Sequence, residues 1–182
     1  MKKLVFVFAA ALFAQVSFAQ GNMKTVEVGG AAMYPNKNIV ENAVNSKDHT
    51  TLVAAVKAAG LVETLQGKGP FTVFAPTNKA FEKLPAGTVE SLVKPENKAT
   101  LTTVLTYHVV AGSMDSQAIA EAIKKGNGTA TFTTVQGGTL TAMMKGKKLM
   151  LKDEKGGTST VTIKDVSQSN GVIHVIDTVV MP

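Results

Sequence analysis

The sequence contains no cysteine, no arginine and no tryptophan among its 182 residues. Without cysteine the chain can form neither disulfides nor thiolate metal sites, and it cannot carry a lipid on an N-terminal cysteine. Arginine is the side chain that nucleic-acid-binding proteins use for bidentate contacts, and aromatic residues, which would stack on bases, are few. The composition therefore argues against nucleic acid as a partner. The formal net charge of +6 leaves a weak attraction to anionic surfaces or polysaccharides open.

Residues 1–19 have the pattern of a secretory signal peptide. Two lysines precede an apolar run over residues 4–14, and Ser17-Phe18-Ala19 forms a small-x-small cleavage site before Gln20. The apolar run is shorter than the roughly twenty residues that a membrane-spanning helix needs. We expect an exported protein, periplasmic or extracellular at the cell surface, with no transmembrane anchor in its mature form.

The rest of the chain is long enough for one domain with a core and too short for two ordinary ones. Residues 20–36 contain glycine and proline without periodicity, which predicts an extended N-terminal arm, and residues 37–182 form the domain. Met33, Tyr34 and Pro35 are apolar residues in this arm. They pack on the domain as a clasp, since termini are commonly tied down in this way, or they form a lid over a groove.

The segment from Gly69 to Phe81 changes conformation several times within a few residues. Residues 71–75 alternate in the manner of a strand covered on both faces, and Pro76 ends the strand because it has no N–H to donate. Thr77 or Asn78 then caps a helix. A strand, a proline corner and a capped helix make a compact structural nucleus without an evident nucleophile or acid–base pair.

Helical patterns dominate before residue 126 and strand patterns after it. We expect helices over 39–44, from a cap at Asp48 to Gly60, over 61–65, over 85–92, from Pro95 to the region of His108, and from Asp115 or Ser116 to Gly126. The period then changes to two, with strands expected over 129–135, 139–144, 147–152, 159–165 and 171–180. Helices followed by strands predict an α+β domain.

The chain has three histidines and no recognisable catalytic constellation. His49 lies beside a helix cap, and we expect it to be exposed to solvent. His108 and His174 fall on apolar patterns, where a lone histidine is usually a hydrogen-bonded core residue. Asp177 alternates out of phase with His174, so we expect these two side chains on opposite faces of their strand. The sequence predicts neither an enzyme nor a bound cofactor or metal ion.

Five lysines gather on two predicted strands and their turns, at positions 145, 147, 148, 152 and 155. Lysines protect edge strands from pairing with other chains, so we expect a solvated edge of the sheet. A surface that contacts acidic glycans is the alternative. Met143, Met144 and Met150 alternate with other strand residues and are expected to pack there.

Three motifs resemble the signatures of the fasciclin-type domain family. They are Phe71-Thr-Val-Phe-Ala-Pro-Thr-Asn-x-Ala-Phe81, the tyrosine–histidine element in Leu105–Val110, and the chain end from Asn170 to Pro182. The resemblance implies packed β-sheets flanked by helices. The residues that carry it, which we expect to be mainly structural, are Phe71, Thr72, Val73, Phe74, Ala75, Pro76, Thr77, Asn78, Phe81, Tyr107, His108, Gly171, Val172, Ile173, His174, Ile176 and Asp177.

The family resemblance implies a binding protein. Fasciclin-type domains usually mediate extracellular adhesion to partner proteins, matrix or other cells, and this chain is similar to a secreted single-domain bacterial member. An arginine–glycine–aspartate adhesion motif is impossible here, because there is no arginine. Some members bind carotenoids, so an exported carrier of an apolar small molecule is the alternative, with residues 33–35 as its candidate lid.

Overall fold

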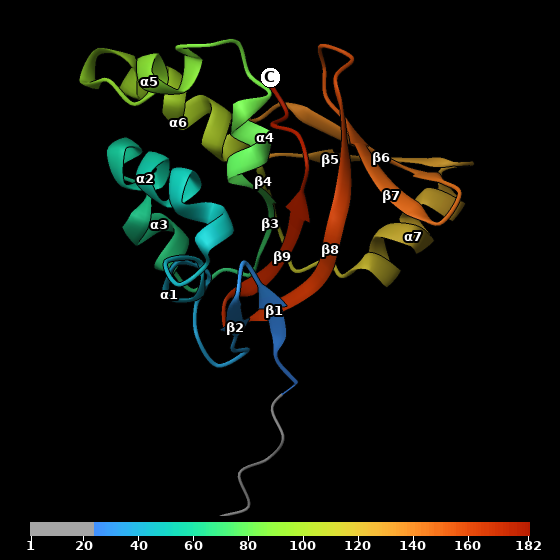
Figure 1. Cartoon of the computed structure of the whole chain (residues 1–182). Helices are drawn as coiled ribbons and strands as arrows, with labels where there is room; N and C mark the ends of the chain where they lie inside the picture. Colours follow the sequence, from blue (N-terminus) through green and yellow to red (C-terminus); the bar gives the residue numbers. More distant parts are fainter. Residues whose placement is uncertain (1–23) are drawn as a thin grey trace, which may run out of the picture.

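A computed structural model describes residues 24–182 (Figure 1). The predicted signal peptide, residues 1–19, lies outside the described residues. Within residues 24–182 we find no helix that is long and apolar enough to cross a membrane. The helices are α1 (Ile39–Ala43), the 3-10 turn η1 (Lys47–His49), α2 (Thr50–Ala59), α3 (Val62–Gln66), α4 (Asn78–Glu82), α5 (Thr88–Leu92), the 3-10 turn η2 (Pro95–Asn97), α6 (Lys98–Tyr107) and α7 (Ser116–Lys125).

The strands form a small hairpin and one large sheet. The hairpin joins β1 (Val26–Val28) and β2 (Ala31–Met33). The seven-stranded sheet has the order β4-β3-β9-β8-β7-β6-β5. Its strands are β3 (Phe71–Pro76), β4 (Val109–Ala111), β5 (Thr129–Thr133), β6 (Thr139–Lys145), β7 (Lys148–Lys152), β8 (Thr158–Gln168) and β9 (Gly171–Ile176). Short helices packed on a sheet that comes mostly from the C-terminal half confirm the predicted α+β class.

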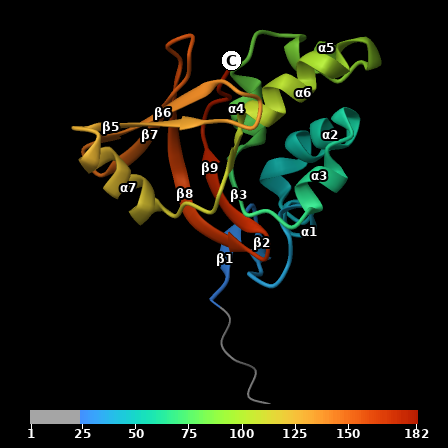
Figure 2. The ribbon, with the colours of Figure 1, turned by 180° about the vertical axis from the view of Figure 1, so that it is seen from behind.

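Strands β3 and β9 lie side by side and parallel, and both are buried on both faces. Successive side chains of a strand point to opposite faces, so each strand supplies two cores. Val73, Ala75, Ile173 and Val175 belong to a cluster beneath α1, α2 and α6, which we call the helix-side core. Phe74 and Ile176 belong to a second cluster with α7 and strands β5–β7, which we call the α7-side core. Figures 1 and 2 show α1, α2, α3, α5 and α6 gathered beside β3 and β9, and α7 beside the other half of the sheet.

The predicted N-terminal arm is not extended throughout. Residues 26–33 form the β1–β2 hairpin, whose turn at Gly29 and Gly30 has φ angles of 59° and 74°. Two consecutive positive φ angles suit glycine, which has no Cβ to clash in that region. Val28 and Met33 are buried in the helix-side core and anchor the hairpin to the domain.

The lysine cluster is solvated, but its expected place at the edge of the sheet is wrong. Its strands, β6 and β7, are internal, and the edges of the sheet are β4 and β5. These edges meet instead: Val110 and Thr134 form a bridge between them, and Val135 N–H donates to the Val109 carbonyl at 2.7 Å. The sheet therefore curls so that its two edge strands satisfy some of each other's free backbone N–H and C=O groups. This protection of the edges does not involve lysine.

The start of α2 also differs from the prediction. Asp48 does not cap this helix, which begins at Thr50 after the 3-10 turn and has no capping side chain from its own N-cap residue. A side chain that is distant in the sequence caps the helix instead. Asn78 Oδ1 accepts the N–H of Thr51 at 3.0 Å, and Asn78 Nδ2 donates to the Lys47 carbonyl at 2.9 Å. Gly60 ends the helix in the left-handed conformation, with φ of 73°, as expected.

Candidate functional site

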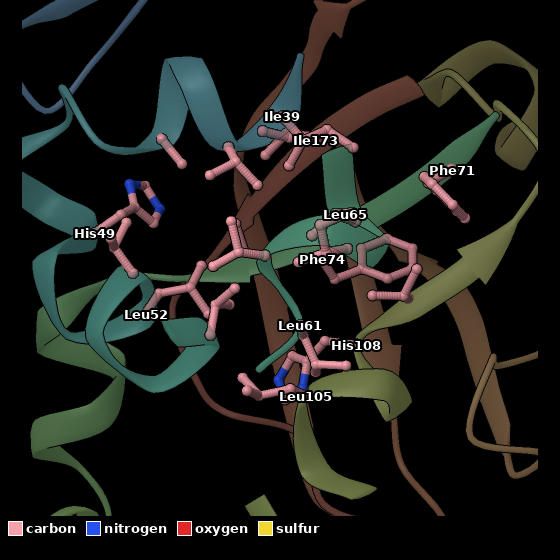
Figure 3. A pocket seen from close by; sticks show the side chains of 18 of the residues that line it. Ile39, His49, Leu52, Leu61, Leu65, Phe71, Phe74, Leu105, His108 and Ile173 are labelled. Atoms are coloured by element: carbon pink, nitrogen blue, oxygen red, sulfur yellow. The ribbon is translucent and has the colours of Figure 1, made fainter. Parts of the chain in front are cut away.

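An apolar cavity of about 80 Å³ lies inside the helix-side core, between the short helices and strands β3 and β9 (Figure 3). Its wall is mostly aliphatic because the inward faces of α1, α2 and α3 carry branched side chains at helical spacing. Lys57 and Thr64, which are exposed, mark where the cavity approaches the surface between α2 and α3. Lining side chains include Val40, Leu52, Val56, Leu61, Val73 and Ile173.

His49 lies in the wall of this cavity, and the prediction that it is exposed is wrong. Only 3% of its surface is accessible, because the 3-10 turn before α2 directs the ring inward. Its Nδ1 lies 2.9 Å from Ser46 Oγ. Its Nε2 is buried and has no hydrogen-bond partner within residues 24–182. Burial lowers the pKa of His49; the Ala75 carbonyl and the Asp48 carboxylate offset part of this effect.

His108 borders the same cavity but has partners at both nitrogens. Its Nδ1 lies 2.8 Å from the Val104 carbonyl, and its Nε2 accepts the Val180 N–H at 3.3 Å. These contacts require the neutral ring with its proton on Nδ1. Burial lowers the pKa of His108 to about 4, against the opposing influence of the Val104 carbonyl and Asp153. This histidine holds the end of α6 to the C-terminal segment.

His174 and Phe74 form the contact between β9 and β3. The two residues are paired in register, and their rings stack with centroids 5.7 Å apart. His174 Nε2 lies 2.9 Å from the Met114 carbonyl, and its Nδ1 accepts the Asp165 N–H at 3.3 Å. Burial lowers the pKa of His174. The ring thus connects β9 to two other segments: Nε2 contacts the segment before α7 at Met114, and Nδ1 contacts the bulge of β8 at Asp165.

Tyr107 is fully buried in the α7-side core and uses its hydroxyl twice. The hydroxyl donates to the Thr139 carbonyl at 2.6 Å and accepts the Glu154 N–H at 3.2 Å. Burial raises the pKa of Tyr107. The side chain thus joins α6 to the start of β6 and to the turn after β7, which are far apart in the sequence.

The remaining predicted residues lie on or beside β3 and β9. Thr72 Oγ1 donates to the Gly112 carbonyl at 2.7 Å, and Thr77 caps α4 by accepting the Ala80 N–H. Asp177 lies away from His174 and accepts the Thr160 N–H at 2.8 Å. Strand β3 supplies Phe71, Val73, Ala75 and Pro76, strand β9 supplies Gly171, Val172, Ile173 and Ile176, and Asn78 and Phe81 belong to α4.

Gly171 shows why glycine is needed where β9 begins. Its φ is 157°, and an added Cβ would lie 2.0 Å from the Phe71 carbonyl oxygen. Any other residue would force the two paired strands apart, because this oxygen belongs to the backbone.

Asn170 opens the third family motif, but sequence reasoning missed its role as a buried junction of three elements. Its Oδ1 accepts the Ile39 N–H at 3.0 Å, and its Nδ2 donates to the carbonyls of Leu65 and Gly67 at 2.8 and 2.9 Å. It therefore caps α1 and α3 from the far end of the chain. An asparagine before a glycine is typical of an ordinary turn, so its pattern gives no sign of this role.

The candidate lid is fixed to the domain at two points. Met33 is 3% exposed and lines the cavity, whereas Tyr34 is 40% exposed. Asn42 holds the Tyr34 backbone by accepting its N–H and donating to its carbonyl, at 3.0 and 2.8 Å. Pro35 follows and is half-buried.

The described part of the chain contains no cluster of three or more acidic or histidine side chains that could hold a metal ion. Each ring nitrogen of His108 and His174 bonds to backbone. The geometry supports binding at the cavity or at the surface. Ser46 and His49, whose Oγ and Nδ1 atoms lie 2.9 Å apart, form a buried pair in the cavity wall.

Comparisons with known proteins agree on one family. The family model of the fasciclin domain matches residues 47–182. Protein sll1483 of Synechocystis sp. is 48% identical over 172 residues, which cover 90% of this chain and 86% of that protein. The cell surface glycolipoprotein MPB83 of Mycobacterium bovis is 36% identical over 160 residues, which cover 85% of this chain and 64% of that protein.

The same fold is found among solved structures. The FAS1 domain pair of the insect cell adhesion molecule fasciclin I superposes with a TM-score of 0.71 at 16% identity, and covers 82% of this chain and 52% of that chain. At this identity the likeness concerns the fold alone.

Proposed function

Because the chain belongs to the fasciclin domain family, we propose that it is an exported, non-enzymatic binding module that mediates adhesion to cells, matrix or partner proteins. The observation that carries this proposal is the match of the family model to residues 47–182. One relative supports a location at the cell surface: MPB83 of Mycobacterium bovis is named a cell surface glycolipoprotein.

The outer face of strands β5–β8 is a candidate contact surface. Leu140, Ala142, Leu149 and Leu151 point into the α7-side core, so the alternate residues of β6 and β7 point outward. These outward residues are polar or half-buried and include three exposed lysines but no acidic residue: Thr139, Thr141, Met143, Lys145, Lys148, Met150 and Lys152. A cationic, hydroxyl-rich sheet face suits a polar, anionic surface.

Attachment assays test the adhesion proposal. Surfaces coated with the purified protein should retain cells of its own host, and the triple variant Lys145→Glu, Lys148→Glu and Lys152→Glu should lose most of that retention. The matched control changes Lys94, Lys124 and Lys125 to Glu, which alters the net charge equally at exposed positions elsewhere. Equal retention by coated and uncoated surfaces, with no change in attachment after deletion of the gene, would contradict the proposal.

A second candidate function is carriage of an apolar small molecule, and the cavity is the observation that favours it. Apolar ligands bind in concave, mostly apolar sites with few polar groups. In this case residues 33–35 close one end of the site, as a lid, with Met33 inside and Tyr34 outside. Tyr34→Ala should then release ligand while the protein stays folded. Equal ligand content in the variant and the parent would remove the lid from this function.

An absorption spectrum of the protein purified from its own host separates the two candidates for coloured ligands. The chain has two tyrosines and no tryptophan, so it does not itself absorb visible light. A stoichiometric visible band would make the protein a pigment carrier. A colourless protein that still promotes attachment would favour adhesion.

A further inference from the structure

His49 is the one titratable side chain in the cavity wall with a buried, unused polar atom within residues 24–182. The other histidine that borders the cavity, His108, has backbone partners at both nitrogens. The Thr106 hydroxyl, which also borders it, donates to the Thr102 carbonyl at 2.7 Å. A buried polar atom without a partner is costly, so it commonly marks a place where a water molecule or a ligand belongs.

We propose that the cavity binds a small apolar alcohol and that the hydroxyl of this ligand forms a hydrogen bond with His49 Nε2. The proposal rests on the second candidate function and names the ligand class and the residue that selects it. The hydrocarbon part of the ligand would occupy the aliphatic space between α2 and strands β3 and β9, which Figure 3 shows opening beside the His49 ring.

The choice of a hydroxyl follows from the chemistry of the ring. If Ser46 Oγ donates to Nδ1, then Nε2 carries the proton and donates; if Nδ1 donates to Ser46, then Nε2 accepts. An alcohol can both donate and accept, so it satisfies either tautomer. A carboxylate can only accept, so it suits one tautomer alone, and it brings an uncompensated charge into an apolar wall, because burial lowers the pKa of His49 and favours the neutral ring.

A backbone carbonyl competes for the same nitrogen. The Ala75 carbonyl lies near enough to raise the pKa of His49 in the way a hydrogen-bond acceptor does, but its contact with the ring lacks the geometry of a hydrogen bond, and Nε2 has no partner within residues 24–182. A rotation of the ring could bring the two together and leave no role for a ligand. The experiment below distinguishes this arrangement from alcohol binding.

The size of the cavity limits the ligand. Its volume is about 80 Å³. An engineered apolar cavity of about 150 Å³ in another protein takes benzene, so this cavity holds a short chain of about four carbons, or the end of a longer one. Exposed Lys57 and Thr64 at the gap between α2 and α3 give a longer chain a way out to solvent.

NMR of the protein with ¹⁵N-labelled histidine tests the proposal. n-Butanol and n-pentane have similar shapes and differ in the hydroxyl, so both should bind, but n-butanol should shift the His49 Nε2 resonance and n-pentane should leave it almost unchanged. His108 and His174 are internal controls, because their nitrogens already have partners. In His49→Leu the ratio of the n-butanol to the n-pentane dissociation constant should rise about fivefold, the effect of one lost hydrogen bond.

A second variant locates the binding. Ala43→Leu fills the cavity from α1 and should abolish binding of both probes, whereas Ala118→Leu, at an exposed site on α7, should leave both dissociation constants unchanged. Binding of both probes without a His49 Nε2 shift from n-butanol would overturn the role of His49 and leave the carrier function standing. No binding of either probe would overturn both.

Discussion

Strands β3 and β9 carry one core on each face, and the two cores differ in how completely they are filled. The α7-side core contains fully buried Tyr107 and Phe74, and the Tyr107 hydroxyl has two partners. The helix-side core is aliphatic, encloses the cavity, and leaves His49 Nε2 without a partner within residues 24–182. The same two strands thus support a core that specifies the fold and a core with room for another molecule.

This difference supports our expectation that the residues of the family motifs are mainly structural. Tyr107 and His174 use their polar atoms in hydrogen bonds inside the protein, and Phe74 is fully buried against the His174 ring, so none of them offers a free polar group to a partner. A function that needs a free group must use the helix-side cavity or the outer surface.

A matched pair of leucine truncations should separate the cores. Leu140→Ala, in the α7-side core, should lower the free energy of unfolding by about 4 kcal/mol, and Leu52→Ala, beside the cavity, by about 2 kcal/mol. A side chain that borders a void has fewer partner atoms to lose. Urea unfolding of both variants measures the difference. Equal losses would mean that the two cores are equally well packed.

Acid should destabilise the protein through its buried histidines. The pKa of His108 is about 4 in the folded chain and near 6.5 in the unfolded chain, so the unfolded state binds protons first. The stability is fully present above pH 6.5 and is lost as the pH falls toward 4, by about 3 kcal/mol for this residue. His49 and His174 shift in the same direction. A free energy of unfolding that stays constant between pH 7 and pH 4 would contradict this account.

A matched pair of alanine enlargements tests free space directly. Ala142→Leu, in the α7-side core, should cost about 2 kcal/mol, because overpacking forces side chains out of their preferred rotamers. Ala43→Leu should leave stability unchanged or raise it by up to about 1 kcal/mol, because the new side chain enters the cavity. Thermal unfolding reports both. The contrast fails if Ala43→Leu is the more destabilised protein.

Removal of the Tyr107 hydroxyl should have the smallest effect. Tyr107→Phe keeps the ring but leaves the Thr139 carbonyl and the Glu154 N–H without this partner. Both residues lie near the surface, where water can replace the hydroxyl, so we expect a loss of about 1 kcal/mol with binding unchanged. Chemical unfolding and attachment assays on one preparation provide the check. Lost attachment in a stable variant would assign Tyr107 to function.

The sequence was sufficient for the fold class and for the buried strands, because apolar alternation at β3 and continuous apolar runs at β9 are local signals. It also placed two helix caps to within one residue: the cap predicted at Thr77 or Asn78 is Thr77, and the cap predicted at Asp115 or Ser116 is Asp115. Long-range polar contacts were not visible. Asn78 serves α2 and Asn170 joins α1 to β9 across large sequence distances, and no local pattern encodes such partners.

The candidate site was harder to predict than the fold. His49 sits beside charged and polar neighbours that favour an exposed position, yet the turn before α2 buries it. A cavity is a property of packing between distant segments, so periodicity cannot reveal it. The five-lysine cluster was correctly expected to be solvated, but the order of the strands, which periodicity does not contain, decides that it is not at an edge.

The most direct test of the difference between the two cores is a crystal structure of the protein under xenon pressure. Xenon enters dry apolar cavities without needing a hydrogen bond. We predict one xenon site in the helix-side core, between Val40, Leu52 and Ile173, and none in the α7-side core. Xenon bound among Leu140, Leu151 and Ile119, or bound nowhere, would contradict the account.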